Sequence, residues 1–263
     1  MTAQPQVWHH GLVARWWAEF NLDGPEISHF RAFIDRSGQP ALDAACGTGR
    51  LLIPYLKSGL DVDGCDISAD MLALCADRAR VEGLAPRLYQ QALHELVLPR
   101  AYRTIVLCGG FGLGATRAQD QEALNRLFSH LQPSGTLVFD LYLPYGWPYW
   151  TKEARQSLPQ PWPEAGDRKR TADGHEIELR RRLLAFDPLD QLATRQIRAI
   201  LWQNDRILRE EEHTLAERLY YRNEVLQMLS IAGFQVTDLL SDHSEQPASS
   251  DSEVLTFVAT KAS

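Results

Sequence analysis

The sequence predicts an α/β protein with a doubly wound, mostly parallel sheet of seven strands and a small antiparallel β insertion. Three observations predict this fold. Residues 40–143 alternate short apolar runs with helical stretches, a glycine turn follows the first of these runs, and three strand-like stretches lie close together between 176 and 215. Alternating strands and helices typically build a parallel sheet, whereas consecutive strands joined by short turns pair antiparallel.

The composition is that of an ordinary soluble globular protein of 263 residues, with 44% hydrophobic and 23% charged residues. This length allows one large domain, or one domain with an appended lid. The net charge of -7 gives no general attraction to phosphate backbones or anionic lipid, because such attraction needs a basic face. We therefore expect neither nucleic acid nor a membrane as a partner.

The chain shows no targeting or metal-binding pattern. Its longest apolar runs, at 104–108 and 136–143, are far shorter than the roughly 20 residues that a membrane helix needs. Residues 1–6 lack the basic region of a signal peptide, so we expect a cytoplasmic protein. The four cysteines have no Cys-x-x-Cys spacing, which predicts reduced core thiols and no metal site: Cys46, Cys65, Cys75 and Cys108.

The first half of the chain is predicted to hold two leading helices and five core strands. The leading helices, at 8–20 and 25–36, have apolar residues at helical spacing. Ser68 is predicted to cap a later helix, because its hydroxyl can accept from a free amide of the first turn. We expect strands at 41–44, 61–65, 87–90, 104–108 and 136–143, separated by helices at 50–58, 69–82 and 120–131.

The second half is predicted to hold the insertion and the last two strands of the sheet. Residues 143–174 are rich in proline and tryptophan and have no clear period, so we expect irregular structure there. The two-residue turn Asn204-Asp205 favours a tight hairpin. Predicted strands at 176–186, 193–203 and 206–215 are followed by a helix at 223–232 and strands at 234–240 and 254–260.

The strongest signal for function is a glycine loop that follows the first core strand. The run from Ala41 to Arg50 is an apolar strand, a turn with Gly47 and Gly49, and the start of a helix. Glycine allows backbone geometry and a close ligand approach that a β-carbon would obstruct. A loop of this kind, at the carboxyl end of the first strand, is where doubly wound folds bind nucleotides.

An acidic residue follows the glycine loop at the expected distance. Asp66 ends the second strand and lies 23 residues after Asp43, close to the offset of about 20 residues that is typical of a ribose-binding carboxylate. A carboxylate there can accept hydrogen bonds from both ribose hydroxyls. The simpler interpretation of Asp66 is a loop residue or a cap for the following helix.

These motifs resemble class I S-adenosylmethionine-dependent methyltransferases of the small-molecule type. The stretch from Asp43 to Gly49 resembles the family's first motif, an acid followed by three alternating glycines, with Ala45 in place of the first glycine. The resemblance continues through Asp66, Ile67 and Met71 and through residues 131–137. It covers about residues 39–142, and more loosely 234–260, which resembles the family's final antiparallel hairpin.

The resemblance implies that S-adenosylmethionine is the cofactor and assigns residues to its parts. Asp43 would lie near the methionine amino end, Asp66 would hold the ribose, and Ile67 and Met71 would flank the adenine. The end of the fourth strand, with Cys108 and Gly109, is where the family places the methionine part and the reactive methyl. The cofactor loop would be lined by Ala45, Cys46, Gly47, Gly49 and Arg50.

One position departs from the family's pattern on the adenine side. The segment 91–96 resembles the next motif, whose aspartate usually accepts from the adenine amino group, but Ala92 stands at that position. The substitution removes one polar contact, worth on the order of 1 kcal/mol. Either the backbone amide of Leu93 or the side chain of Gln91 is then expected to recognise the adenine.

Two other interpretations use the same architecture. A nicotinamide-dependent oxidoreductase needs a third glycine in Gly-x-Gly-x-x-Gly, and Leu52 occupies that position. A methyltransferase-like domain that has lost turnover and serves as a binding module is the second alternative, and Ala92 favours it. The retained loop and Asp66 favour the active enzyme.

The acceptor is expected to be a small molecule that is methylated on nitrogen or oxygen rather than carbon. Methyl transfer is a direct displacement that chiefly needs a nucleophile held in line, so no catalytic residue is assigned. Aromatic residues suited to a pocket wall are the candidates for contacting the acceptor: Trp17, Tyr142, Tyr145 and Tyr221. We expect a monomer or a homodimer.

The resemblance also divides the chain by role. Residues 1–38 would form helices covering the cofactor site, and 39–145 the cofactor-binding core. Residues 146–222 would form an irregular segment and an antiparallel lid that contributes to acceptor specificity. Residues 223–263 would complete the core sheet with a helix and a hairpin. The run Arg180, Arg181 and Arg182 within the lid is interpreted as a solvated strand face.

Overall fold

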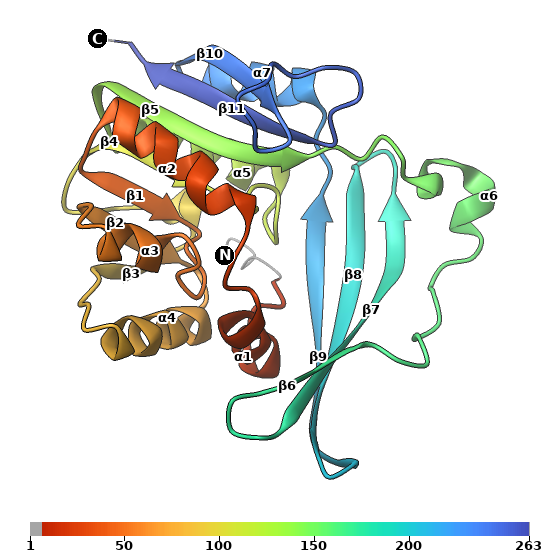
Figure 1. Ribbon diagram of the computed structural model, residues 1–263. Coiled ribbons are helices and arrows are strands. Elements are labelled where there is room, and N and C mark those ends of the chain that lie inside the picture. Colours follow the sequence, from red (N-terminus) through yellow and green to blue (C-terminus); the bar gives the residue numbers. More distant parts are fainter. Residues whose placement is uncertain (1–6, 263) are drawn as a thin grey trace. The chain divides into compact units, whose positions relative to one another are not determined.

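Seven strands form the main sheet of the computed structural model, which describes residues 7–262 (Figure 1). Their order across the sheet is β10-β11-β5-β4-β1-β2-β3. The strands are β1 (Ala41–Ala44), β2 (Val62–Asp66), β3 (Leu88–Gln90), β4 (Tyr102–Leu107), β5 (Leu131–Tyr142), β10 (Phe234–Ser241) and β11 (Val254–Lys261). The predicted doubly wound sheet is confirmed.

The order of the strands reverses at β1. This strand pairs in parallel with β2 on one side and with β4 on the other. β11 pairs antiparallel with both β5 and β10, so the last two strands form the predicted hairpin at the edge of the sheet. The carboxyl ends of β1 and β4 therefore make the switch point at which doubly wound folds bind ligands.

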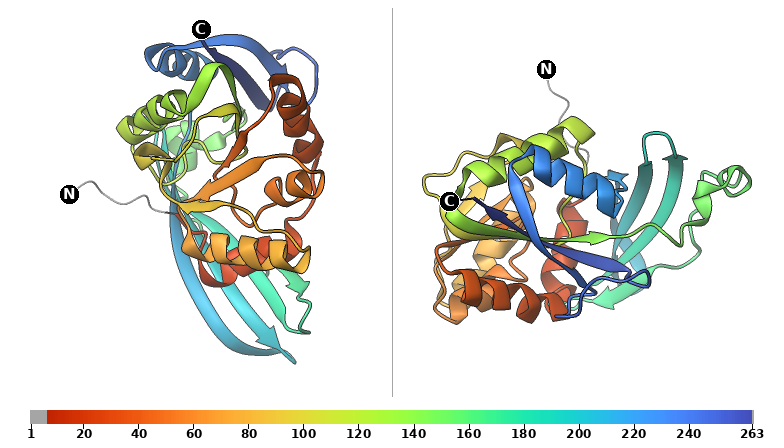
Figure 2. Two further views of the ribbon diagram at one scale, coloured as in Figure 1. Left: turned by 90° about the vertical axis from the view of Figure 1, so that its left-hand side faces the viewer. Right: turned by 90° about the horizontal axis from the view of Figure 1, so that it is seen from above.

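Helices cover both faces of this sheet, as Figure 2 shows. On one face, α2 (Pro25–Ser37), α3 (Leu52–Lys57) and α4 (Ala69–Val81) bury apolar side chains such as Phe30, Leu52 and Leu72. On the other face, α5 (Arg117–Ser129) and α7 (Arg222–Ile231) do so. Apolar stripes at helical spacing and buried strands thus build a hydrophobic core on each face of the sheet.

A second, four-stranded sheet belongs to a separate unit of the chain. Its antiparallel order is β6-β7-β8-β9, formed by β6 (Asp167–Arg170), β7 (Glu176–Asp187), β8 (Leu192–Gln203) and β9 (Arg206–Arg218). Helix α1 (Gly11–Phe20) packs on it, with Trp16 against Ile177 and Ile197 in the same core. The carboxylate of Glu211 accepts from the amide of Leu12 at 2.9 Å and so stabilises the amino end of α1.

The two units divide the chain differently from the segments proposed from sequence. One unit holds 23–111, 117–145 and the residues from 220 onward; the other holds the residues up to 22, 112–116 and 146–219. The leading segment is shared, because α1 belongs with the four-stranded sheet and α2 with the seven-stranded one. Residues 1–6, on which the expectation of no signal peptide rests, lie outside the described residues.

The segment expected to be irregular contains short elements that its pattern did not indicate. They are β6, the 3-10 helix η2 (Pro148–Trp150) and α6 (Lys152–Arg155). β6 reads Asp-Arg-Lys-Arg and is held at the sheet edge by backbone pairing with β7, so it has no apolar alternation. The predicted tight hairpin is confirmed, since Asn204 and Asp205 have φ of 48° and 59°, as a type I′ turn requires.

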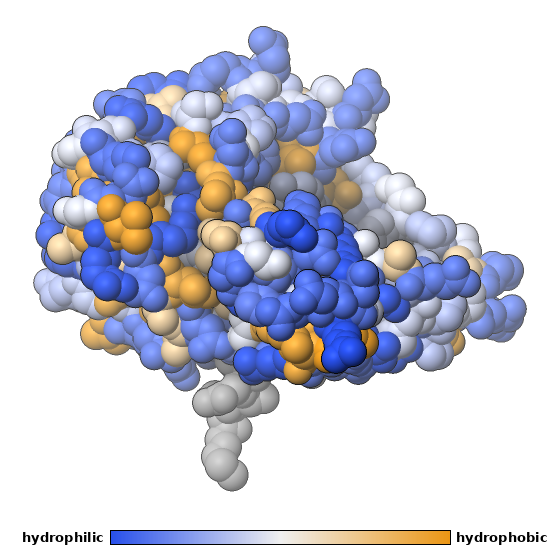
Figure 3. All heavy atoms as spheres, turned by 60° about the horizontal axis from the view of Figure 1, so that its bottom comes forward, coloured by the Kyte–Doolittle hydropathy of each residue, from blue (hydrophilic) through white to orange (hydrophobic). Residues whose placement is uncertain are grey.

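One face of the molecule shows how polar its surface is (Figure 3). The face in Figure 3 is mostly hydrophilic, and apolar residues reach it in small, separate groups. Within residues 7–262, no helix has both the length and the apolar character needed to cross a bilayer.

Candidate functional site

The turn after β1 adopts the left-handed backbone geometry for which glycine is suited. Ala45, Gly47 and Gly49 have φ of 57°, 53° and 81°. A β-carbon at Gly47 would meet no atom within 4 Å, whereas one at Gly49 would lie 2.6 Å from the sulfur of Cys75. Gly49 is therefore needed for packing against α4, while Gly47 presents bare backbone to open space. Ala45 takes the strained geometry despite its β-carbon.

Asp66 ties this turn to the end of β2. One of its carboxylate oxygens accepts from the amide of Gly47 at 2.9 Å, and the other accepts from the amide of Ser68 at 2.8 Å. The hydroxyl of Ser68 in turn accepts from the amide of Met71 at 3.2 Å, which confirms the predicted cap of α4. Asp66 thus fixes the loop geometry, and a carboxylate oxygen that accepts one bond can accept another.

Asp43 is a buried carboxylate at the same edge. Its residue is only 2% exposed, and one oxygen has no hydrogen-bond partner among the described residues. Burial raises the pKa of Asp43 to about 7; the cation of Arg50 opposes this rise and the charge of Asp66 adds to it. Buried polar atoms are nearly always bonded, so an unpartnered oxygen here fits a ligand that brings its own donor.

The end of β4 lies within the same network. Arg50 forms an ion pair with Glu26 at 2.9 Å, and its guanidinium also donates to the sulfur of Cys108 at 3.3 Å. Gly109 has φ of 63°, and a β-carbon there would meet nothing within 4 Å. Its amide donates to the carboxylate of Asp140, a residue that the sequence analysis did not single out.

The residues predicted on the adenine side follow β2 and β3. Ile67 is half-buried and Met71 is buried on α4. Ala92 is buried and precedes the 3-10 helix η1 (Leu93–Glu95). The side-chain amide of Gln91 is already engaged, since it accepts from the amide of Val97 at 2.7 Å and donates to its carbonyl at 3.0 Å.

The predicted acceptor residues fall in both units. In the unit of the seven-stranded sheet, Tyr142 and Tyr145 are exposed, and the ring of Tyr145 stacks on that of Tyr221 with 5.7 Å between centroids. Trp17 belongs to the other unit, where it packs edge-on against Trp16 at 5.0 Å. The role of the antiparallel insertion in acceptor specificity stays a prediction.

The arginine run on β7 is not a uniform solvated face. Arg180 pairs with the buried carboxylate of Glu178 at 2.7 Å, and Arg182 donates to Gln196. Arg181 instead approaches the ring of Trp17 on the face that carries α1, with 5.9 Å to its centroid. Alternation along the strand separates Arg181 from its two neighbours.

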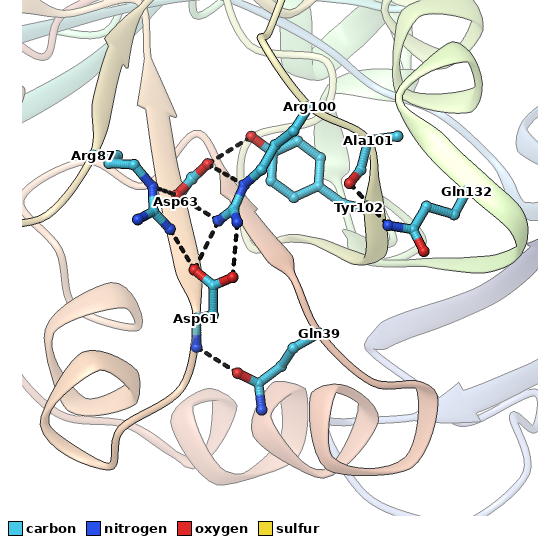
Figure 4. Close-up of polar contacts among 8 residues, drawn as sticks. All are labelled: Gln39, Asp61, Asp63, Arg87, Arg100, Ala101, Tyr102 and Gln132. Carbon is cyan, nitrogen blue, oxygen red and sulfur yellow. Dashed lines mark hydrogen bonds and ion pairs between the residues drawn. The ribbon is translucent and has the colours of Figure 1, made fainter.

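A second buried aspartate, Asp63, lies near the amino end of β2 (Figure 4). It is fully buried and accepts from Arg87 at 2.5 Å, from Arg100 at 2.8 and 2.9 Å, and from the hydroxyl of Tyr102 at 2.9 Å. Asp61 shares both arginines. Within the described part of the chain, no group of three or more His, Cys, Asp or Glu side chains could hold a metal ion.

A family profile for a methyltransferase domain matches residues 41–135, which run from β1 into β5 and include the glycine loop and Asp66. Residues 41–135 are thus a methyltransferase domain, and together with the seven-stranded sheet they support a class I S-adenosylmethionine-dependent methyltransferase. The nicotinamide-dependent alternative is thereby overturned, and Leu52 at its third glycine position is a buried residue of α3.

Two proteins with similar sequences are named as methyltransferases. A protein of Geobacillus sp. (strain WCH70) described as a methyltransferase is 23% identical over 223 residues, 84% of this chain and 83% of that protein. The dTDP-3-amino-3,6-dideoxy-alpha-D-glucopyranose N,N-dimethyltransferase of Streptomyces fradiae is 31% identical over 164 residues, 58% of this chain and 59% of that one.

A solved structure shares the fold of the methyltransferase. The crystal structure of an S-adenosylmethionine-dependent methyltransferase from Clostridium acetobutylicum ATCC 824 has a TM-score of 0.73 and 18% identity, and the match covers 95% of this chain and 97% of that one.

Proposed function

We propose that this methyltransferase transfers the methyl group of S-adenosylmethionine to a nitrogen or oxygen atom of a small molecule. The observation that carries the proposal is the set of groups at the carboxyl ends of β1, β2 and β4. These groups are a buried oxygen of Asp43 that has no partner among the described residues, the exposed backbone at Gly47 and Gly109, and the carboxylate of Asp66. These groups fit a ligand with an ammonium, a ribose and a planar base.

Asp66 would hold the ribose while it keeps the loop in place. Its carboxylate accepts from the amides of Gly47 and Ser68 and, with about four lone-pair sites, would also accept from the ribose hydroxyls. Ile67 and Met71 would flank the adenine. Because the side chain of Gln91 is bonded to Val97, we favour the backbone amide of Leu93 over Gln91 as the group that recognises the adenine.

Asp43 would bind the ammonium at the methionine end. A cation beside this carboxylate favours its ionised form, which burial alone disfavours. Arg50, held by its ion pair with Glu26, would remain near Asp43 as a fixed positive charge. When bound, S-adenosylmethionine supplies a methyl group on a cationic sulfur that is open to direct displacement.

An amine is the acceptor that we favour. The relative from Streptomyces fradiae is named as an N,N-dimethyltransferase of an amino sugar. An uncharged amine attacks with its lone pair and loses a proton afterwards, so it needs orientation more than a strong base. The stacked rings of Tyr145 and Tyr221 and the exposed ring of Tyr142 offer flat surfaces against which a small acceptor can lie.

The experiment has two stages. Isothermal titration calorimetry with S-adenosylmethionine, S-adenosylhomocysteine and NAD is expected to give micromolar binding of the first two and none of NAD. Transfer from methyl-labelled S-adenosylmethionine is then measured with amino sugars and with matched sugars that carry hydroxyl in place of the amine.

Label in the amine series alone supports the nitrogen acceptor, and label in the hydroxyl series overturns it in favour of oxygen. Cofactor binding without transfer to either series, or to any small molecule of a cell extract, would favour the silent binding module instead. Failure to bind either adenosyl compound would overturn the proposed cofactor site.

A further inference from the structure

Asp140 is a buried carboxylate near the end of β5 that the proposed function leaves without a role. It is 3% exposed. One oxygen accepts from the amide of Gly109 at 2.5 Å; the other accepts from the thiol of Cys108 at 3.6 Å and lies 2.9 Å from Nε2 of His243. A single carboxylate therefore joins the end of β4 to His243, which lies 103 residues after Asp140 in the chain.

The loop that carries His243 is held in an unfavourable backbone geometry. Asp242 and His243 both have φ of 51°, in the left-handed region that residues with a β-carbon avoid. The carboxylate of Asp242 accepts from the amides of Glu253 at 3.0 Å and Val254 at 2.8 Å, which fixes this geometry from within the hairpin. Such geometry persists where the surroundings impose it, and it is concentrated at functional positions.

The ring of His243 is also fixed from the side. It packs against His29, with 5.6 Å between centroids, and against Phe30 at 6.1 Å, both on α2. His29 directs its Nε2 to the hydroxyl of Thr256 at 3.1 Å and makes no hydrogen bond to Asp140. His243 and His29 thus share one packed cluster, but His243 contacts the carboxylate and His29 does not.

The bond to Asp140 decides which way the peptide between Cys108 and Gly109 faces. In a trans peptide the N–H and C=O groups point in opposite directions. With the amide of Gly109 directed at Asp140, the carbonyl of Cys108 must point away from it. Gly109 has open space where a β-carbon would stand, so this peptide can turn unless something holds it.

We propose that the Asp140–His243 pair is a positioning element that fixes the Cys108–Gly109 peptide for the methionine end of the cofactor. The inference rests on the proposed function, because it concerns the same site. His243 donates to the carboxylate and keeps it in place, and the carboxylate keeps the amide of Gly109. Neither side chain needs to touch the cofactor.

Two ligands separate this role from a general structural one. S-adenosylhomocysteine has the amino-acid end, and 5′-methylthioadenosine lacks it. His243→Phe keeps an aromatic ring and loses the donor. It is expected to lower the affinity for S-adenosylhomocysteine about tenfold and to change the affinity for 5′-methylthioadenosine by no more than about twofold. His243→Gln, which restores an N–H donor, should recover most of the loss. His29→Phe is the matched control and should change neither affinity.

The free protein offers a readout that does not depend on a ligand. The amide of Gly109 should be protected from hydrogen exchange in the wild type and in His29→Phe, and exposed to exchange in His243→Phe. Asp140→Ala, which removes the acceptor of the Gly109 amide, is measured in the same way if His243→Phe does not fold.

Wild-type affinity of His243→Phe for both ligands, or an equal loss for both, would overturn the positioning role. Unchanged protection of Gly109 in that variant would overturn it as well. A wild-type protein that binds neither ligand would contradict the proposed function, while the exchange measurement would still decide the role of the pair.

Discussion

Two buried aspartates on neighbouring strands show what distinguishes the two faces of the sheet. Leu42 on β1 lies opposite Asp63 on β2, and Asp43 lies opposite Gly64. Both carboxylates are almost fully buried. Asp63 accepts from two arginines and a tyrosine hydroxyl, whereas one oxygen of Asp43 has no partner in the described part of the chain.

The same residue type stabilises the fold on one face of the sheet and, as proposed, would bind a ligand on the other. Near the amino end of β2, the charge of Asp63 is neutralised by groups that the chain itself supplies (Figure 4). At the carboxyl end of β1, the chain leaves a carboxylate with a raised pKa beside a glycine loop. Sites of function commonly retain such local costs in stability.

The largest expected effect is a loss of stability at Asp63. Asp63→Ala removes the acceptor of two guanidinium groups and should lower the free energy of unfolding by about 3 kcal/mol, the low end for breaking a buried ion pair, because both arginines keep access to water. Urea unfolding measures the loss, and calorimetry should show an unchanged affinity for S-adenosylhomocysteine. A loss of affinity in the folded variant would contradict the division of roles between Asp63 and Asp43.

The next effect falls on the cofactor rather than on stability. Asp66→Ala should weaken S-adenosylmethionine binding by about 1.5 to 3 kcal/mol, as expected for hydrogen bonds to a charged acceptor. Asp66→Asn serves as control, since its amide oxygen can still accept from Gly47 or Ser68. If the folded alanine variant bound the cofactor as tightly as the wild type, the role of Asp66 would be limited to stabilising the loop.

Stability should depend on pH through Asp43. Its pKa in the folded protein is about 7, above the ordinary value of 3.8, so the folded state holds its proton more tightly than the unfolded chain does. The resulting stabilisation is complete below about pH 4 and is lost as the pH rises through 7. Urea unfolding at pH 5.5 and 8.0 should therefore show that Asp43→Asn gains stability relative to the wild type at the higher pH. Parallel pH profiles of the two proteins would contradict the raised pKa.

The smallest effect concerns the strained loop. Ala45 has φ of 57°, so Ala45→Gly relieves a left-handed alanine and should stabilise the protein by up to about 1 kcal/mol, less the entropy that glycine costs. Ala92→Gly is a comparison in which φ is -74° and no relief is available. Thermal unfolding of both variants measures the difference, and equal destabilisation would show that Ala45 is not strained.

The fold was predictable because the strands from β1 to β5 are short and are separated by helical segments. The parallel pairing of β1 with β2 and with β4 is of the kind that this alternation indicates. β6 could not be found in the same way, because four charged residues at a sheet edge pair through their backbone alone. The grouping of α1 with the second sheet depends on packing of Trp16 and Leu12, which helical spacing shows but does not assign to a partner.

The candidate site was predictable where it follows the chain locally. Gly47, Gly49 and Asp66 stand at fixed offsets after two strands, and those offsets carry the signal. Asp140 and His243 were missed because only the pairing of β5 with β11 brings them together. The one available hint was a lone acid inside the apolar run of β5.

We propose that the oxygen of Asp43 that has no partner among the described residues accepts the ammonium group of the cofactor. Calorimetric titration of S-adenosylhomocysteine at pH 6.5, in buffers of different ionisation enthalpy, counts the protons released on binding. We expect the wild type to release a substantial fraction of one proton, because the carboxyl of Asp43, with a pKa of about 7, must ionise beside a cation. Asp43→Asn should release none. Equal proton release by both proteins, or tight binding by the wild type with none, would contradict this proposal.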